Sequence, residues 1–132
     1  MARDTTISSA PAPMAASNAN RLTFTAVGSS ALTGDISVEE ENGGTEIDVT
    51  IRNSTDGAVH KGYVHSGTCA SIGAVVAPLN DIRIDGDRDG DSETQLQLPM
   101  ATVMNGQHTV VYHEAGGNPG APAVCVAIPA HM

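Results

Sequence analysis

The chain contains no tryptophan and very few other aromatic residues, with one phenylalanine and two tyrosines in 132 residues. Because aromatic side chains normally supply a large share of buried area, the core has to be built from smaller aliphatic residues. Basic residues are also scarce: six stand against fifteen acidic ones, and the formal net charge is −9. An acidic surface repels nucleic-acid phosphates, which argues against binding to DNA or RNA.

Long hydrophobic runs are absent as well. No apolar stretch approaches the ~20 residues that a transmembrane helix needs, so we expect no membrane-spanning segment. Residues 1–20 are rich in alanine, serine and proline, and they lack the basic and apolar regions of an intact signal peptide. We predict that they form a disordered tether, of the kind that follows a removed signal in a periplasmic, secreted or lipid-anchored protein, and that residues 21–132 form one domain.

Short alternating segments fill the rest of the chain. Fourteen glycines and seven prolines, together with many valine, isoleucine and threonine residues, favour strands joined by turns. No segment longer than a turn has helical periodicity. The pattern predicts an all-β antiparallel sandwich or flattened barrel of seven or eight strands. The expected strands lie within residues 21–27, 31–40, 45–53, 60–69, 70–84, 92–99, 107–114 and 121–129.

Two cysteines, Cys69 and Cys125, lie far apart in the sequence, and neither has C-x-x-C spacing. They are either two free thiols or one disulfide, and export of the protein favours the disulfide. Such a bridge closes a loop of roughly 57 residues and stabilises the fold by about 4 kcal/mol in the chain-entropy model.

An acidic segment covers residues 84–93. Asp85, Asp87, Asp89 and Gly90 match the opening of an EF-hand calcium loop, but the twelfth position is Leu96 where a bidentate glutamate is needed. No flanking helices are expected either. We therefore interpret the segment as a solvated acidic turn.

Histidines are over-represented for so small a domain, and four of the five fall into two strand-like segments: His60 and His65, then His108 and His113. Neutral imidazole is a common ligand of copper and zinc. Residues five apart in a regular strand point to opposite faces, so neither segment can aim both histidines at one metal unless the strand bends, for example at Gly62. The parity predicts a pair with one histidine from each segment, and any single histidine can instead be a core or surface residue.

Four stretches of sequence resemble the copper–zinc superoxide dismutases over about residues 22–129. They are V-H-S-G-T-C, L-N-D-I-x-x-D-G-D-x-D-G, V-V-Y-H-E and the closing C-x-x-I-P. The likeness is greatest to short bacterial copper-only relatives with an H-x-x-H-x-H-x-G-T-C segment. This resemblance implies a Greek-key β-sandwich with copper bound on its outside by His65 and His113. It also implies a Cys69–Cys125 disulfide.

The chain departs from that family at several positions. Tyr63 stands where the first histidine of H-x-H belongs, and residues 70–81 contain none of the family's zinc-loop histidines. Pro122 lies near the position of an arginine that guides superoxide to copper. The family's set of copper ligands is therefore incomplete in this chain. We prefer His60 as the third ligand, and Tyr63, His108, Met104 and His131 remain alternatives.

These features predict an exported protein that binds, buffers or transfers copper, or carries out redox chemistry at a histidine site. Efficient superoxide dismutation is not expected, because the chain has both an altered copper-ligand position at Tyr63 and no guiding arginine near Pro122. Two alternatives stay open: a copper-only dismutase with altered ligands, and a metal-free structural or interaction module. A homodimer that shares a metal between two chains is also compatible with the parity of the histidines.

Overall fold

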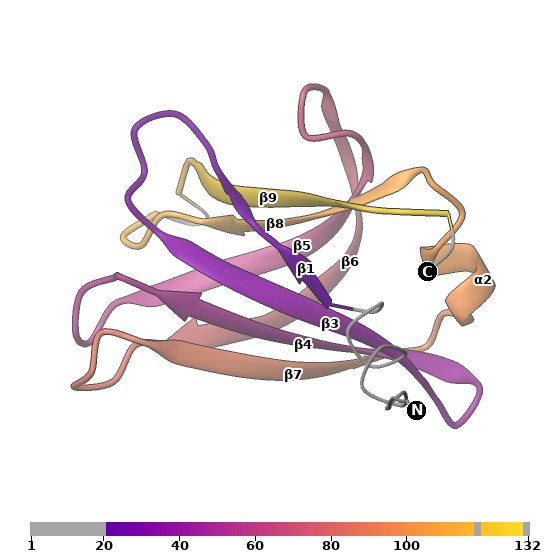
Figure 1. Ribbon diagram of the computed structural model, residues 1–132, viewed down its shortest axis with the longest axis horizontal. Coiled ribbons are helices and arrows are strands. Elements are labelled where there is room, and N and C mark those ends of the chain that lie inside the picture. Colours follow the sequence, from indigo (N-terminus) through magenta and orange to yellow (C-terminus); the bar gives the residue numbers. More distant parts are fainter. Residues whose placement is uncertain (1–20, 118–119, 131–132) are drawn as a thin grey trace, which may run out of the picture.

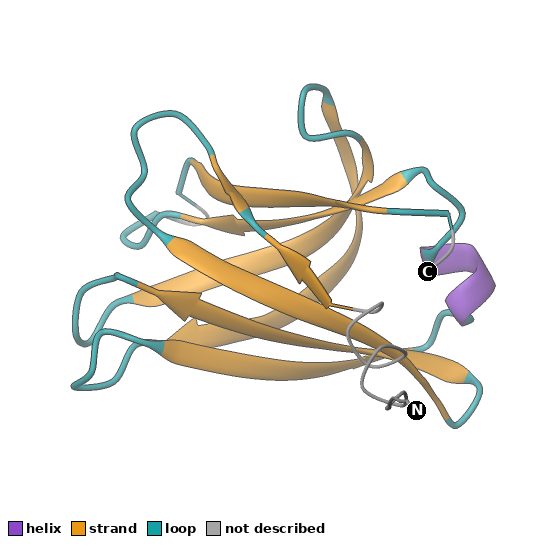
Figure 2. Cartoon of the chain, viewed as in Figure 1, coloured by secondary structure: helices purple, strands orange, loops and turns teal. Residues whose placement is uncertain are grey.

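The computed structural model describes residues 21–117 and 120–130, so the expected tether at residues 1–20 and His131 lie outside the described residues. The described chain is a two-layered β structure with one short helix (Figures 1 and 2). Its elements are β1 (Arg21–Thr23), β2 (Thr25–Ala26), β3 (Thr33–Glu41), β4 (Gly44–Arg52), β5 (Val59–Gly67), β6 (Ile72–Arg83), β7 (Gly90–Leu96), α2 (Met100–Val103), β8 (His108–His113) and β9 (Pro122–Ile128).

The strands form two antiparallel sheets. One has the order β1-β3-β4-β7 and the other the order β2-β9-β8-β5-β6. Strands β4 and β7 pair with each other although the chain visits the second sheet between them, which is a Greek-key type of crossing. This confirms the predicted all-β sandwich. The single helical element, α2, is only four residues long.

The core between the sheets is aliphatic, as the shortage of aromatic residues requires. Strand β4 and the first part of β3 alternate between buried and partly exposed side chains, and the buried ones include Ile36, Val38, Ile47 and Val49. The facing sheet contributes a further group of buried residues, which includes Val64, Val110 and Tyr112. Gly62 leaves room for the Tyr112 ring, because a Cβ there would clash with the ring.

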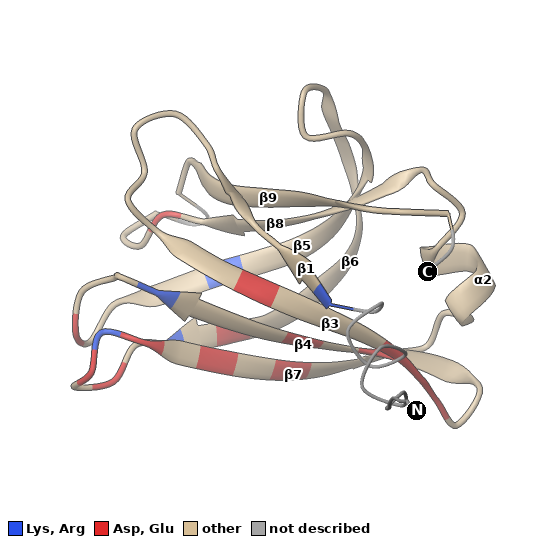
Figure 3. Cartoon of the chain, viewed as in Figure 1, with Lys and Arg blue, Asp and Glu red and all other residues tan. Residues whose placement is uncertain are grey.

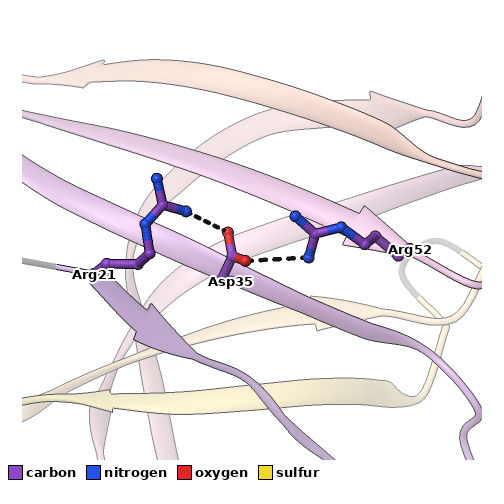
Figure 4. A network of polar contacts seen from close by, with 3 residues as sticks. All are labelled: Arg21, Asp35 and Arg52. Carbon is purple, nitrogen blue, oxygen red and sulfur yellow. Dashed lines mark hydrogen bonds and ion pairs between the residues drawn. The ribbon is translucent and has the colours of Figure 1, made fainter. Parts of the chain in front are cut away.

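Charged residues are concentrated on one part of the molecule. Acidic residues lie along β3, β4 and β7 and in the turns beside them (Figure 3). Arg21 and Arg52 both bind the Asp35 carboxylate, at 3.0 and 3.1 Å (Figure 4). Such exposed ion pairs contribute little stability. By contrast, residues 62–80 and 94–113 contain no lysine, arginine, aspartate or glutamate, so the second sheet is mostly uncharged.

The acidic turn at residues 85–89 is held by its own hydrogen bonds. The Asp87 amide donates to the Asp85 carboxylate at 2.8 Å, and the Asp85 amide donates to the carbonyl of Asp89 at 2.9 Å. The Arg88 guanidinium donates to the Ser54 carbonyl at 2.9 Å. The side chains of Asp85 and Asp87 are exposed to solvent.

The predicted disulfide is confirmed. Cys69, in the loop after β5, is bonded to Cys125 in the middle of β9, with their Cα atoms 5.9 Å apart. The bridge therefore fixes the β5–β6 loop to the sheet. Within the described ranges, the structure has no helix of the length and apolar character that crossing a membrane requires.

Candidate metal centre

The candidate site lies on the outer face of the second sheet, where β5 and β8 pair. Val64 and Tyr112 point into the core, so their odd-numbered neighbours face outward. Tyr63 and His65 on β5 and His113 on β8 lie on this outer face. The centroids of the His65 and His113 rings are 6.2 Å apart. The structure thus brings together one histidine from each segment, as the parity of the strands predicts.

His65 is oriented by a backbone carbonyl. Its Nδ1 lies 3.0 Å from the carbonyl oxygen of Gly73, at the start of β6. Because a carbonyl can only accept, Nδ1 carries the hydrogen and the lone pair of the neutral ring is on Nε2. The side chain is 8% exposed, and its buried Nε2 has no hydrogen-bond partner among the described residues.

His113 has the same arrangement. Its Nδ1 donates to the carbonyl of Gly120 at 2.8 Å, and its buried Nε2 likewise has no partner within the described ranges. Burial lowers the pKa of His113, and the nearby His65 ring lowers it further, although the hydrogen bond to Gly120 acts in the opposite direction. The balance favours the neutral ring, which is the form that binds metal.

Two unpartnered imidazole nitrogens on one face are unusual, because a buried acceptor without a partner costs about 1–3 kcal/mol. A backbone carbonyl that fixes Nδ1–H and leaves Nε2 free is the arrangement typical of metal-ligating histidines. The donor set present here therefore fits a cation that imidazole binds well, such as copper or zinc.

His60 lies on the core-facing side of β5 and is only 2% exposed. Both of its nitrogens are engaged: Nδ1 donates to the backbone carbonyl of His113 at 2.8 Å, and Nε2 accepts from the hydroxyl of Ser54 at 2.7 Å. The expected bend at Gly62 does not bring His60 to the outer face. The register of β5 with β6 does shift between His60 and Gly62, but Gly62 still faces the core. In this position His60 holds the backbone at His113.

Tyr63 is half-buried and contacts both candidate ligands. Its ring centroid lies 5.6 Å from that of His113 and 6.0 Å from that of His65, with interplanar angles of 80° and 76°. The three rings therefore form a cluster on the outer face.

The other expected ligands are placed differently. His108 begins β8, five residues before His113, and its Nδ1 lies 3.1 Å from the side-chain oxygen of Asn105. Met104 packs in the hydrophobic core. His131 lies outside the described residues. The structure thus brings Tyr63, but neither His108 nor Met104, to the two outer-face histidines.

A second group of potential ligands, which the sequence patterns did not indicate, lies on the other sheet. Carboxylate oxygens of Glu46, Asp48 and Glu93 lie within 4.8 Å of one another, because the register pairs Asp48 with Glu93. The neighbouring Asp48 and Glu41 carboxylates raise the pKa of Glu46 to about 8. Clustered carboxylates without imidazole are typical of an acidic surface as much as of a cation site.

Comparison with known proteins identifies the fold. No family model matches the sequence, and no curated protein matches it. Among solved structures, a double mutant of a SOD-like protein from Bacillus subtilis, with a tyrosine and a proline each replaced by histidine, is 14% identical with a TM-score of 0.62. The match covers 83% of this chain and 97% of that one.

A Cu/Zn superoxide dismutase from Brucella abortus is 17% identical with a TM-score of 0.61, and the match covers 82% of this chain and 99% of that one. The similarity in each case extends over nearly the whole length of the known protein. The chain therefore has the Greek-key β-sandwich fold of the copper–zinc superoxide dismutases.

Proposed function

We propose that this protein binds copper through the Nε2 atoms of His65 and His113. The observation that carries the proposal is the pair of buried Nε2 atoms without hydrogen-bond partners on one face of the sheet. The resemblance in sequence and the fold shared with a Cu/Zn superoxide dismutase support copper as the metal. Copper would supply a Lewis-acidic, redox-active centre at this face.

The chain's own residues prepare the two ligands. The carbonyls of Gly73 and Gly120 hold the Nδ1–H tautomers and so leave both lone pairs on the Nε2 atoms. Burial keeps His113 neutral. His60 binds the backbone carbonyl of His113 and so fixes the position of this ligand relative to β5.

We further propose copper binding, buffering or transfer in preference to fast superoxide dismutation. Superoxide is an anion, and a protein with a net charge of −9 repels it unless local cations guide it. Residues 62–80 and 115–130, which surround His65 and follow His113, contain neither lysine nor arginine. Lys61, the nearest basic residue to His65 in the sequence, is ion-paired with Asp81 at 3.2 Å. These segments therefore supply no unpaired cation to guide superoxide.

The disulfide supports an oxidising location for this function. Disulfides persist in secreted and periplasmic proteins and are rare in a reducing cytosol. We therefore propose that the protein works outside the cytoplasm, with residues 1–20 as its tether.

Metal titration tests the proposal directly. Isothermal titration with Cu(II), Cu(I) and Zn(II) is carried out on the unaltered protein, His65→Ala, His113→Ala and the control His108→Ala. We expect copper binding that either outer-face substitution weakens by more than about tenfold, whereas His108→Ala leaves it unchanged. Binding weaker than about 10 µM in the unaltered protein, or equal losses in the His108 control, would contradict the proposal.

Dismutase activity of the copper-loaded protein separates the two copper hypotheses. A fast dismutation rate that His113→Ala abolishes would establish the enzyme. The expected result is copper binding with little dismutation.

A further inference from the structure

We propose that the hydroxyl oxygen of Tyr63, as a phenolate, is the third donor to a Cu(II) ion held by His65 and His113. This inference rests on the proposed copper site and names a ligand that completes it. It assigns to Tyr63 a role that differs from packing alone, and it predicts which oxidation state of copper the site prefers.

The rings of Tyr63, His65 and His113 lie close together on the outer face of the sheet. The centroid separations of 5.6, 6.0 and 6.2 Å make a nearly equilateral triangle. Tyr63 precedes His65 by two residues and so shares its outward face on β5. It pairs with Val111 on β8, two residues before His113. Strand register therefore places Tyr63 between the two histidines along this face.

Other side chains near the two histidines already have hydrogen-bond or ion-pair partners. Both nitrogens of His60 are hydrogen-bonded, and the nearest charged side chains in sequence to His65 are Lys61 and Asp81, which bind each other at 3.2 Å. Within residues 21–117 and 120–130, Tyr63 is the ring that contacts both imidazoles. Among the described residues, its hydroxyl makes no hydrogen bond.

The binding step is a simple exchange of a proton for the metal. A tyrosine hydroxyl ordinarily keeps its proton at neutral pH, and a bound cation makes its loss favourable. The O–H bond breaks, an O–Cu(II) bond forms, and the proton passes to water. No electron is transferred. The resulting set of two neutral nitrogens and one anionic oxygen favours Cu(II), whereas Cu(I) prefers soft donors.

Absorption spectroscopy of the Cu(II)-loaded protein provides the test. Coordinated phenolate gives a phenolate-to-Cu(II) charge-transfer band, with tyrosinate vibrations in resonance Raman spectra excited within that band. The chain has two tyrosines and no tryptophan, so the assignment needs only two variants. Tyr63→Phe removes only the hydroxyl at the site. Tyr112→Phe is the matched control. The Tyr112 hydroxyl lies away from the site and donates a hydrogen bond of 2.8 Å to the Asn80 carbonyl.

We expect Tyr63→Phe to abolish the band and to weaken Cu(II) binding by at least about tenfold, while Cu(I) binding changes little. Tyr112→Phe keeps the band. Tyr63→His restores Cu(II) affinity without the band, because imidazole replaces the oxygen donor. Thermal unfolding of metal-free Tyr63→Phe checks that the fold is intact, and since Tyr63 is half-buried we expect a midpoint close to that of the unaltered protein.

The possible failures are distinguishable. Copper binding that depends on His65 and His113 but shows no charge-transfer band, or keeps the band in Tyr63→Phe, overturns the role of Tyr63 and leaves the proposed function standing. Equal Cu(II) affinity of Tyr63→Phe and the unaltered protein likewise overturns the role of Tyr63 and leaves the proposed function standing. Absence of copper binding in the unaltered protein overturns both.

Discussion

Replacing His60 by leucine tests whether this histidine positions the metal centre without being a ligand. The substitution keeps a side chain of similar bulk in a site that is 2% exposed and removes both hydrogen bonds of the ring. The His113 carbonyl and the Ser54 hydroxyl then lose their partner. The backbone at His113 loses its hydrogen bond to His60, so the His113 ring is less well fixed for binding copper.

The magnitude follows from these two contacts. A buried hydrogen bond contributes about 0.5–1.5 kcal/mol net, and a buried carbonyl left without a partner costs about 1–3 kcal/mol. We therefore expect His60→Leu to lower the free energy of unfolding of the metal-free protein by about 2–4 kcal/mol. Loss of a group that orients a metal ligand typically weakens metal binding by about 10–100-fold.

Urea denaturation of the metal-free protein and copper titration of the folded variant measure the two effects separately. Ser54→Ala is the matched control, because it removes the hydrogen bond at Nε2 and keeps the one to the His113 carbonyl. It should lower stability by about 1 kcal/mol and leave copper affinity nearly unchanged. If His60→Leu is as stable as the unaltered protein and binds copper equally well, the positioning role is refuted. If His60 were itself a ligand, its replacement would instead weaken copper binding as much as His113→Ala does.

Three further predictions concern the disulfide, the acidic sheet and the altered ligand position. Replacing both Cys69 and Cys125 by alanine should lower the free energy of unfolding by about 4 kcal/mol in urea denaturation, and an unchanged midpoint would contradict this. The neighbouring carboxylates raise the pKa of Glu46 from 4.5 to about 8, so the folded state binds more protons than the unfolded state between these values, and stability falls as pH rises through them. Glu46→Gln should therefore raise the thermal midpoint at pH 9 relative to the unaltered protein and have no such effect at pH 4, whereas equal shifts at both pH values would exclude the charge effect. Tyr63 and Pro78 pair across β5 and β6, so the double variant Tyr63→His, Pro78→His should bind Zn(II) at least about tenfold more tightly in titration, and unchanged affinity would mean that this face cannot accept further ligands.

The main features of the fold follow from short-range patterns in the sequence. Alternation of aliphatic and polar residues identifies β3 and β4, because a strand with one buried face needs a period of two. The same period predicts a pair with one histidine from each segment, and the resemblance to the superoxide dismutases selects His65 and His113. The strands and the parity of the pair need only the geometry of a single strand and of its neighbours.

The parts that the sequence did not predict depend on contacts between distant segments. The preferred third ligand, His60, is instead engaged by Ser54 and by a backbone carbonyl 53 residues away. Carbonyls that orient the ligands, from Gly73 and Gly120, carry no side-chain signal. The cluster formed by Asp48 and Glu93 needs the register of β4 with β7, which hydrophobic patterning alone does not fix.

Electron paramagnetic resonance of the Cu(II)-loaded protein shows whether His65 and His113 bind copper, because coupling to nitrogen nuclei reports the imidazoles bound to the metal. We expect coupling to two imidazole nitrogens in the unaltered protein and to one in His65→Ala or in His113→Ala. His60→Leu and His108→Ala should retain two. A signal without nitrogen coupling, or one that neither outer-face substitution alters, would contradict a copper site formed by His65 and His113.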